Sequence, residues 1–216
     1  MKKEEHVNIS EITITLPRRR PFKNIYQFKI TVLETNPPVW RRIQVPENYT
    51  FYDLHVAIQD AMGWLDYHLH MFDIEDASRP KGKTRIECPF GIEDIEEEEI
   101  LLTTEVPLKE FFKKSGDGAL YTYDFGDNWE LEVLFEKKLS KEPKTKYPVC
   151  RDGQLAGPPE DAGGVFGYYQ CIEAIKKKDD SEGLLSWVGH WRPDKFNPKK
   201  VLFENPRTRL KFALRD

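Results

Sequence analysis

Two stretches of alternating hydrophobic and polar residues near the start of the chain predict neighbouring strands of a sheet. Apolar residues occupy every second position over Tyr26–Val32, and they do so again over Val39–Val45 except at Arg41, so each segment has one mainly apolar face and one mainly polar face. Asn36-Pro37-Pro38 separates the two segments, and prolines cannot continue a ladder of hydrogen bonds. We therefore predict two strands joined by a turn.

The following segment predicts a helix that covers one face of this sheet. Thr50 and Asp53 form a start resembling a capping box, and Gly63 suits the residue after the helix end. A single apolar stripe lies between them at helical spacing: Leu54, Ala57, Ile58, Ala61 and Met62. A strand predicted over His68–Ile74 completes a strand–strand–helix–strand unit. This order indicates an α+β fold and also suits a β-grasp-like arrangement, although chain order alone does not fix topology.

The rest of the chain predicts further strands and short helices. Residues 75–100 read as a long excursion, which includes an acidic run with six acidic residues in the seven of Glu93–Glu99. A hairpin is predicted from Ala119–Asp124 and Trp129–Glu136, and short helices are predicted over residues 107–114, 168–175, 184–188 and from 198 onward. We expect a mixed or antiparallel sheet packed with a few helices. It forms a single α+β domain over residues 25–216, preceded by an N-terminal appendage over residues 1–24 that holds a strand at 11–16.

Composition describes an ordinary protein that is slightly polar. The 216 residues are 39% hydrophobic and 32% charged, and the net charge of −4 argues against nucleic-acid binding by the whole surface. The basic stretch from Arg192 to Arg215 is either a solvated surface or a place for phosphate contacts. Three cysteines without a CxxC pair fit a reduced compartment, and no apolar run reaches the length of a membrane span. We expect a cytoplasmic protein that does not enter a membrane.

The segment Tyr123–Trp129, YDFGDNW, carries more chemistry than a turn requires. Its Asp, Gly and Asn residues suit a tight reversal of the chain. Asp124 and Asp127 are therefore turn residues that accept backbone hydrogen bonds, or else ligands, general bases or anchors for cationic groups. Together with an exposed Trp129 they would present a binding surface at the tip of the hairpin.

The PPED segment poses the same question. Glu160 and Asp161 follow two prolines that stiffen the chain, and Gly163-Gly164 lets the backbone come close to another loop or to a ligand. If the FGD and PED loops converge, four carboxylates would line one cleft. Their mutual repulsion would then raise at least one carboxyl pKa unless a cation lies there.

Two further pairs are candidates. His68 and His70 are two residues apart and point the same way on a strand, so they either share a divalent metal or serve as acid–base or structural histidines. Because His70 shares its face with Phe72 and Ile74, a partly buried ring bonded to a backbone carbonyl is the expectation we favour. Trp40 and Arg42 share the other strand's polar face, where they either bind a base or an anion, or the tryptophan covers a second apolar layer while Arg41 or Arg42 bridges a carboxylate such as Asp124.

Five blocks, in this order, resemble the plasmid pRiA4b ORF-3-like family across roughly residues 26–203: NPPVWRRIQVP, the helix ending in AMGW, HLHMF, YTYDFGDNWELEVLFE, and YPVC followed by GPPEDAGG. The resemblance implies an α+β domain of bacteria and archaea whose relatives occur on plasmids and as passengers of insertion elements. It implies no established activity. This chain departs from the pattern at three positions, since Leu131, Gly157 and Ala162 stand where relatives often carry His or Cys, which weakens any thiolate metal site.

Three functions follow as hypotheses. The first is a binding or accessory module associated with mobile elements, which uses the cleft between the FGD and PED loops with Trp40, Arg42 and Trp129. The second is a metal-assisted hydrolase or nuclease built from the histidines and carboxylates of the HLH, FGD and PED segments. The third is a nucleic-acid accessory role for the basic C-terminal stretch. Walker, GxGxxG, HExxH and GxSxG motifs are absent from the sequence, which leaves the common nucleotide and hydrolase readings without support.

Overall fold

A computed structural model describes residues 5–9, 12–16, 21–76, 82–90 and 101–213. Its strands are β1 (Glu5–Ile9), β2 (Ile12–Leu16), β3 (Asn24–Val32), β4 (Trp40–Pro46), β5 (His70–Glu75), β6 (Lys83–Glu87), β7 (Leu101–Leu102), β8 (Gly118–Tyr123), β9 (Trp129–Ser140) and β10 (Val149–Gln154). Its α-helices are α1 (Phe51–Met62), α2 (Gly164–Lys177), α3 (Leu184–Val188) and α4 (Pro206–Ala213), and two short 3₁₀ turns span Leu108–Glu110 and Pro198–Lys200.

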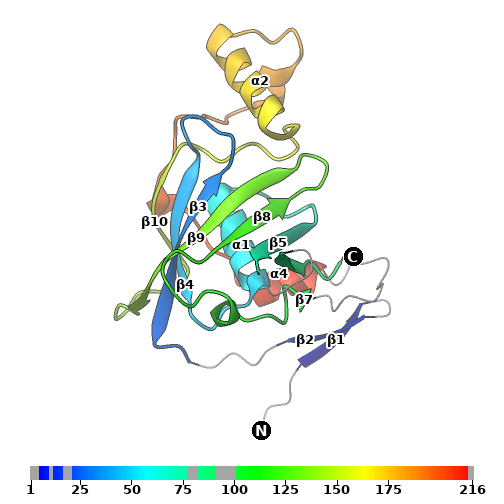
Figure 1. The fold of residues 1–216 in the computed structure, drawn as a ribbon. Coiled ribbons are helices and arrows are strands. Elements are labelled where there is room, and N and C mark those ends of the chain that lie inside the picture. Colours follow the sequence, from blue (N-terminus) through cyan, green and yellow to red (C-terminus); the bar gives the residue numbers. More distant parts are fainter. Residues whose placement is uncertain (1–4, 10–11, 17–20, 77–81, 91–100, 214–216) are drawn as a thin grey trace.

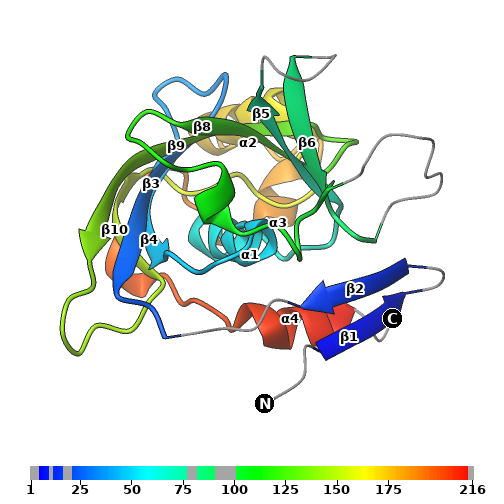
Figure 2. The same cartoon turned by 60° about the horizontal axis from the view of Figure 1, so that its bottom comes forward.

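One large sheet organises the chain. Its eight strands lie in the order β10-β4-β3-β9-β8-β5-β6-β7, and every neighbouring pair is antiparallel except β6 and β7. Figure 2 shows the sheet curved around α1. The predicted α+β class is confirmed. A β-grasp pairs its first strand with a parallel neighbour, whereas both neighbours of β3 are antiparallel, so the β-grasp-like arrangement does not describe this sheet.

The strands β1 and β2 pair only with each other, in a separate antiparallel ribbon that lies outside the large sheet. Figure 1 shows this ribbon at one end of the molecule and α2 at the other end, beyond the rims of the strands. The alternation at residues 11–16 therefore does form a strand, in the part of the chain we predicted to be an appendage.

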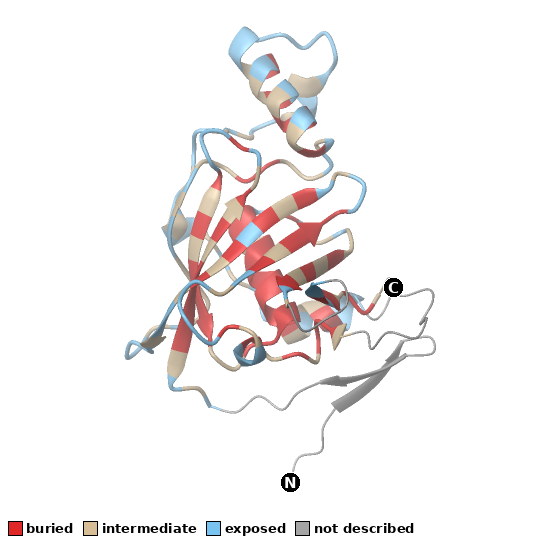
Figure 3. Cartoon of the chain, viewed as in Figure 1, coloured by how far each residue is buried: buried red, intermediate tan, exposed pale blue. Residues whose placement is uncertain are grey.

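Helix α1 is the centre of the fold. The predicted capping box is present, because Thr50 accepts a hydrogen bond from the backbone of Asp53 while the Asp53 carboxylate accepts one from the backbone of Thr50. Gly63 ends the helix in the left-handed conformation, with φ 84°. Every residue of the helix except Asp60 is buried, and Figure 3 shows α1 as a mostly red ribbon. The buried residues include His55 and Gln59, which lie outside the predicted apolar stripe. The helix is thus enclosed, with α4 among its neighbours.

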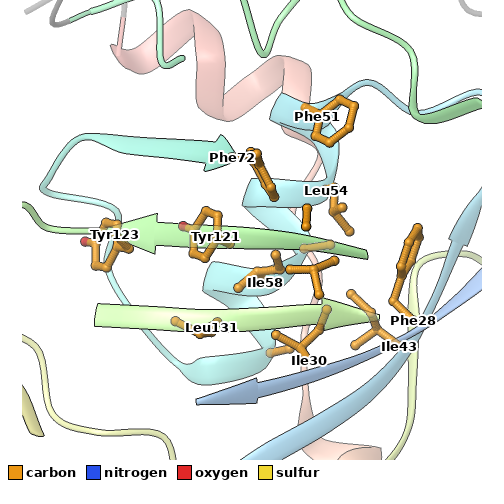
Figure 4. Packing of buried hydrophobic residues seen from close by; sticks show 14 of the residues in the cluster. Phe28, Ile30, Ile43, Phe51, Leu54, Ile58, Phe72, Tyr121, Tyr123 and Leu131 are labelled. Atoms are coloured by element: carbon orange, nitrogen blue, oxygen red, sulfur yellow. The ribbon is translucent and has the colours of Figure 1, made fainter. Parts of the chain in front are cut away.

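Aromatic and aliphatic side chains fill the space between α1 and the sheet. Figure 4 shows how side chains of β3, β4, β5, β8 and β9 point towards the helix. The labelled members of this cluster are all buried: Phe28, Ile30, Ile43, Phe51, Leu54, Ile58, Phe72, Tyr121, Tyr123 and Leu131. In β3, β5 and β9 the inward face is therefore the apolar face that the alternation indicated.

The predicted excursion over residues 75–100 is only partly an excursion. Residues 83–87 form β6, in which buried Thr84 and Ile86 alternate with exposed Lys83 and Arg85. Only five residues alternate between the glycine turn and Pro89, and this pattern is too short to predict a strand by itself. The acidic run Glu93–Glu99 lies outside the described residues. Among the helices of the described ranges, none is long and apolar enough to cross a membrane.

Candidate functional site

The FGD turn is held in shape by one of its own carboxylates. Asp124 Oδ1 accepts hydrogen bonds from the backbone of Gly126 at 3.0 Å and of Asp127 at 3.3 Å. Asp124 and Asn128 both have positive φ, at 55° and 52°, a conformation that Asp and Asn tolerate better than most residues. The turn chemistry we predicted is therefore present. It leaves Asp124 Oδ2 with no bond to the turn that the structure records.

The PED loop packs directly against this turn. The backbone of Gly163 donates to Asp127 Oδ2 at 2.9 Å. A β-carbon built on Gly164 would lie 2.5 Å from the carbonyl oxygen of Asp127, so only glycine fits there. The paired glycines thus bring the backbone close to another loop, one of the two alternatives from the sequence.

Three further hydrogen bonds hold the PED loop against the segment after α1 and against β8. Glu160 accepts from the backbone of Leu65 at 2.7 Å and from the hydroxyl of Tyr123 at 2.5 Å. The indole of Trp64 donates to the carbonyl of Pro158 at 3.0 Å. A β-carbon on Gly157 would lie 2.0 Å from the carbonyl oxygen of Met62. Glycine at position 157, where relatives often carry cysteine, therefore lets the loop lie on the helix end.

His68 lies where the two loops meet. Its Nε2 is 2.7 Å from Asp161 Oδ1 and 3.6 Å from Asp124 Oδ2 (Asp161 is 60% exposed, His68 34% and Asp124 11%). Burial alone would lower the pKa of His68. The hydrogen bond to Asp161 and the charges of Asp124, Asp161 and Glu160 outweigh that effect and raise the pKa above its ordinary value. We call His68, Asp124 and Asp161 the junction site.

The four carboxylates of the two loops divide into two pairs. Asp127 and Glu160 are used to join the loops, as described above. Asp124 Oδ2 and the exposed Asp161 instead face an imidazole. When it is protonated, His68 supplies a cation between these carboxylates, and their charges raise its pKa. Because the two loops touch directly, they form an exposed contact where a carboxylate-lined cleft was the expectation.

Trp40, Arg42 and Trp129, which we predicted to line a surface between these loops, have other partners. Trp129 is 1% exposed and packs against Trp64 in the core, because its place at the start of β9 is an inward one. Arg42 pairs with Glu136 at 2.8 Å and with Asp152 at 3.3 Å, and it does not bridge Asp124. Trp40 bonds Gln154 of β10.

His68 and His70 belong to two separate clusters. His68 precedes β5 and lies in the junction site, whereas His70 is the first residue of β5 and is 2% exposed. The ring of His70 stacks on that of His55 of α1, with centroids 3.5 Å apart. The expected bond from His70 to a backbone carbonyl is wrong, since neither ring nitrogen has a partner among the described residues.

Two clusters of the described residues have metal-ligand chemistry. His68, Asp124 and Asp161 form one, and His55, Asp66 and His70 form the other. In each, the three ligand atoms lie within 4.8 Å of one another. Sequence reasoning missed His55 and Asp66. His55 is four residues before Gln59 on the polar side of a predicted amphipathic helix, which gave no sign that this side is also buried.

Comparison with known proteins identifies the family of this chain. Residues 24–200 match the profile of the plasmid pRiA4b ORF-3-like protein family. The chain belongs to this family. The uncharacterised protein y4hQ of Sinorhizobium fredii (strain NBRC 101917 / NGR234) is 30% identical over 170 residues, which cover 77% of this chain and 81% of that protein.

A solved structure of the same fold is also similar. The protein of unknown function MM3350 from Methanosarcina mazei Go1 superposes with a TM-score of 0.73 at 40% sequence identity. The alignment covers 85% of this chain and all of that one. The family and its relatives thus support the fold, and their names specify no ligand or reaction.

Proposed function

We propose that the protein is a binding module, an accessory to a protein partner, and that its junction site takes a basic side chain of that partner. The observation that carries this proposal is the placement of His68 between Asp124 and Asp161. Two carboxylates from distant parts of the chain converge on one imidazole, which is an organic cation when it is protonated. A guanidinium or ammonium group satisfies the same two acceptors.

The surroundings of the junction site favour a protein partner. Phe125, next to Asp124, is 52% exposed, and Tyr67, next to His68, is 70% exposed. Leu65, whose backbone bonds Glu160, is 57% exposed. Exposed aromatic and aliphatic side chains around a charged site are typical of protein interfaces and cover the aliphatic stem of a bound lysine or arginine. An accessory role beside a mobile element belongs to the same proposal and is supported by the family resemblance.

The site also predicts a pH dependence of binding. Protonated His68 occupies the carboxylates and repels an incoming cation. Because the pKa of His68 is raised, this competition persists above the ordinary histidine range and ends as the pH rises through that raised pKa. Affinity for a cationic partner should therefore increase with pH across this range.

A fluorescent hexa-arginine peptide, followed by fluorescence anisotropy at low salt, tests the proposal. The variant Asp124→Asn with Asp161→Asn removes two charges, while asparagine still provides the Oδ1 acceptor and tolerates the positive φ at both positions. The matched control, Glu130→Gln with Glu132→Gln, removes two charges from β9 without touching the junction site. We expect binding to be lost in the first variant and kept in the control. Equal binding by both variants would show that peptide affinity reflects net charge alone.

A metal-assisted hydrolase or nuclease is the second candidate, because the His68, Asp124 and Asp161 ligand atoms lie within 4.8 Å of one another. Two carboxylates and one imidazole suit a divalent cation that would activate water. Titration of the protein with Mn²⁺, followed by the paramagnetic broadening of the His68 ring signals, tests this candidate. Broadening at stoichiometric metal that is lost in Asp124→Asn supports it, and unbroadened His68 signals remove it.

A further inference from the structure

A second cluster of ligand-type residues lies inside the protein, near the inner end of the 63–67 turn. The rings of His55 and His70 are nearly parallel, at 9°, with centroids 3.5 Å apart. Asp66 Oδ1 lies 2.7 Å from His55 Nε2. The three side chains come from α1, from the turn after it and from β5, so the cluster joins three elements of the fold.

His70 makes no hydrogen bond within the described structure that would explain a buried polar ring at this position. It is 2% exposed, and neither of its ring nitrogens has a hydrogen-bond partner among the described residues. Burial, with a smaller contribution from His55, holds the pKa of His70 well below its ordinary value, so the ring is neutral. A neutral imidazole has one N–H and one lone pair, and a buried polar atom without a partner destabilises the folded protein. A metal ion would take up the lone pair.

The neighbours of His55 allow it to become a ligand. The hydroxyl of Tyr121 lies between His55 and Gln59. Its oxygen is 2.8 Å from His55 Nδ1 and accepts a hydrogen bond from Gln59 Nε2 at 2.9 Å. In this arrangement the hydroxyl donates to Nδ1 and His55 Nε2–H donates to Asp66. Gln59 Oε1 is buried and has no partner among the described residues.

Turning the Gln59 amide over gives a second arrangement that keeps two hydrogen bonds at the Tyr121 hydroxyl and gives up the bond from His55 Nε2–H to Asp66. Tyr121 then donates to Gln59 Oε1 and accepts from His55 Nδ1–H, which leaves the lone pair of Nε2 free for a metal. An outer hydrogen bond that fixes the tautomer of a metal-bound histidine is common in metal sites. In this second arrangement the amide oxygen of Gln59 has a partner, and its Nε2 takes the buried position where Oε1 had none among the described residues.

The local charge favours a divalent cation. Arg209 of α4 pairs with Asp60 at 2.6 Å and Glu204 at 3.1 Å, and its Nη1 lies 3.6 Å from Asp66 Oδ2. When ionised, these three carboxylates exceed the single guanidinium by two negative charges. An ion of charge two beside Asp66 would neutralise the group.

A route from solvent to the cluster is present. An open groove of about 910 Å³ is lined by Asp66 together with side chains of α4 and of the segment after β10, among them Trp191, Phe196 and Leu202. The side chain of Asp66 is 14% exposed and reaches inward to His55. A hydrated cation therefore meets Asp66 first, and a coordinated water can face the groove.

We propose that His55, Asp66 and His70 bind a divalent transition metal, for which Zn²⁺ is the best chemical match. Two imidazole nitrogens and one carboxylate oxygen are zinc ligands, and their three ligand atoms lie within 4.8 Å of one another. Lone pairs lie in the planes of the rings, so binding tilts the His70 ring out of its stack on His55. The metal ties α1, the 63–67 turn and β5 together, and it holds the turn from which His68 and Tyr67 approach the junction site.

The test uses the full chain, stripped of metal with a chelator and titrated with ZnCl₂ by calorimetry, with thermal unfolding in parallel. His70→Phe is the decisive variant: His70 makes no recorded hydrogen bond, so the change removes a ligand while keeping an aromatic ring in the stack. His68→Gln is the control for the junction site. We expect a single tight site and a rise of the melting temperature with Zn²⁺ in the wild type and in His68→Gln, and loss of both effects in His70→Phe.

A structural defect and a lost metal ligand give different results. His70→Phe should melt, without metal, at or above the temperature of the metal-free wild type, because no hydrogen bond is lost. Co²⁺ in place of Zn²⁺ should give visible absorption bands in the wild type that His70→Phe lacks. Absence of tight Zn²⁺ binding by the wild type, or tight binding that survives in His70→Phe and disappears in His68→Gln, would overturn the proposal.

Discussion

Nε2 of His68 lies 2.7 Å from Oδ1 of Asp161, although the two residues are 93 positions apart in the chain. This contact joins the turn after α1 to the PED loop, and Asp124 of the FGD turn completes the group at 3.6 Å. The arrangement depends on Gly157 and Gly164, where a β-carbon does not fit, and on the hydrogen bonds that Asp127 and Glu160 accept.

Stability should depend on pH through His68. The pKa of His68 is raised in the folded protein, so its interaction with the two aspartates is fully present below the ordinary histidine pKa of about 6.5. It is lost as the pH rises through the higher folded value. Urea unfolding at a series of pH values should show this decline in the wild type, and the decline should be absent in His68→Gln. An identical slope in both proteins would mean that another group titrates.

Gly157→Ala should destabilise the protein by about 1–3 kcal/mol, the usual cost of overpacking. The new methyl group would lie 2.0 Å from the carbonyl oxygen of Met62, so the PED loop must lift from the end of α1. The control is Gly118→Ala, where the nearest atom, at 3.5 Å, is in ordinary contact. Chemical denaturation measures both, and equal stability of the two variants would show that the loop is free to move.

Tyr123 and Glu160 should be coupled. Their hydrogen bond is charge-assisted, and Glu160 also holds the backbone of Leu65. Burial, and then the bond to Glu160, raise the pKa of Tyr123, so the phenol stays protonated and donates. A double-mutant cycle with Tyr123→Phe and Glu160→Gln should give a coupling energy of about 1–3 kcal/mol. Additive effects would show that the bond contributes nothing to stability.

Arg42→Ala should leave hexa-arginine binding unchanged. Its guanidinium pairs with Glu136 and Asp152, two residues that have no contact with the junction site in the described structure. The anisotropy assay described above measures this directly. A loss of affinity equal to that of the Asp124 and Asp161 double variant would show that the binding surface extends onto β4.

The sequence predicts the local elements well because each has its own pattern. The strands from Tyr26 and Val39, the capped helix and the FGD hairpin all follow from alternation, capping residues and turn chemistry. The sequence alone does not predict that the FGD and PED loops converge. In the structure they do, because the backbone of Gly163 donates a hydrogen bond to Asp127.

The sequence-based predictions were wrong where a helix or strand is buried on its polar face as well as on its apolar face. A strand or a helix shows which face is apolar, but it does not show that a second layer covers the polar face. His55 and Gln59 are polar and fully buried for this reason, since other parts of the chain enclose α1. Trp129 is buried because its register on β9 places it towards Trp64, whereas its position beside the turn suggested an exposed ring.

The account rests on Asp124 and Asp161 accepting a cation in place of His68, and the imidazole pKa of His68 reports this most directly. Proton NMR of the ring signals across a pH series, without and with saturating hexa-arginine peptide, measures that pKa in each state. A bound guanidinium competes with the imidazolium for the same carboxylates, so the account predicts that the peptide lowers the pKa of His68. A pKa that stays the same or rises when the peptide is bound would contradict it.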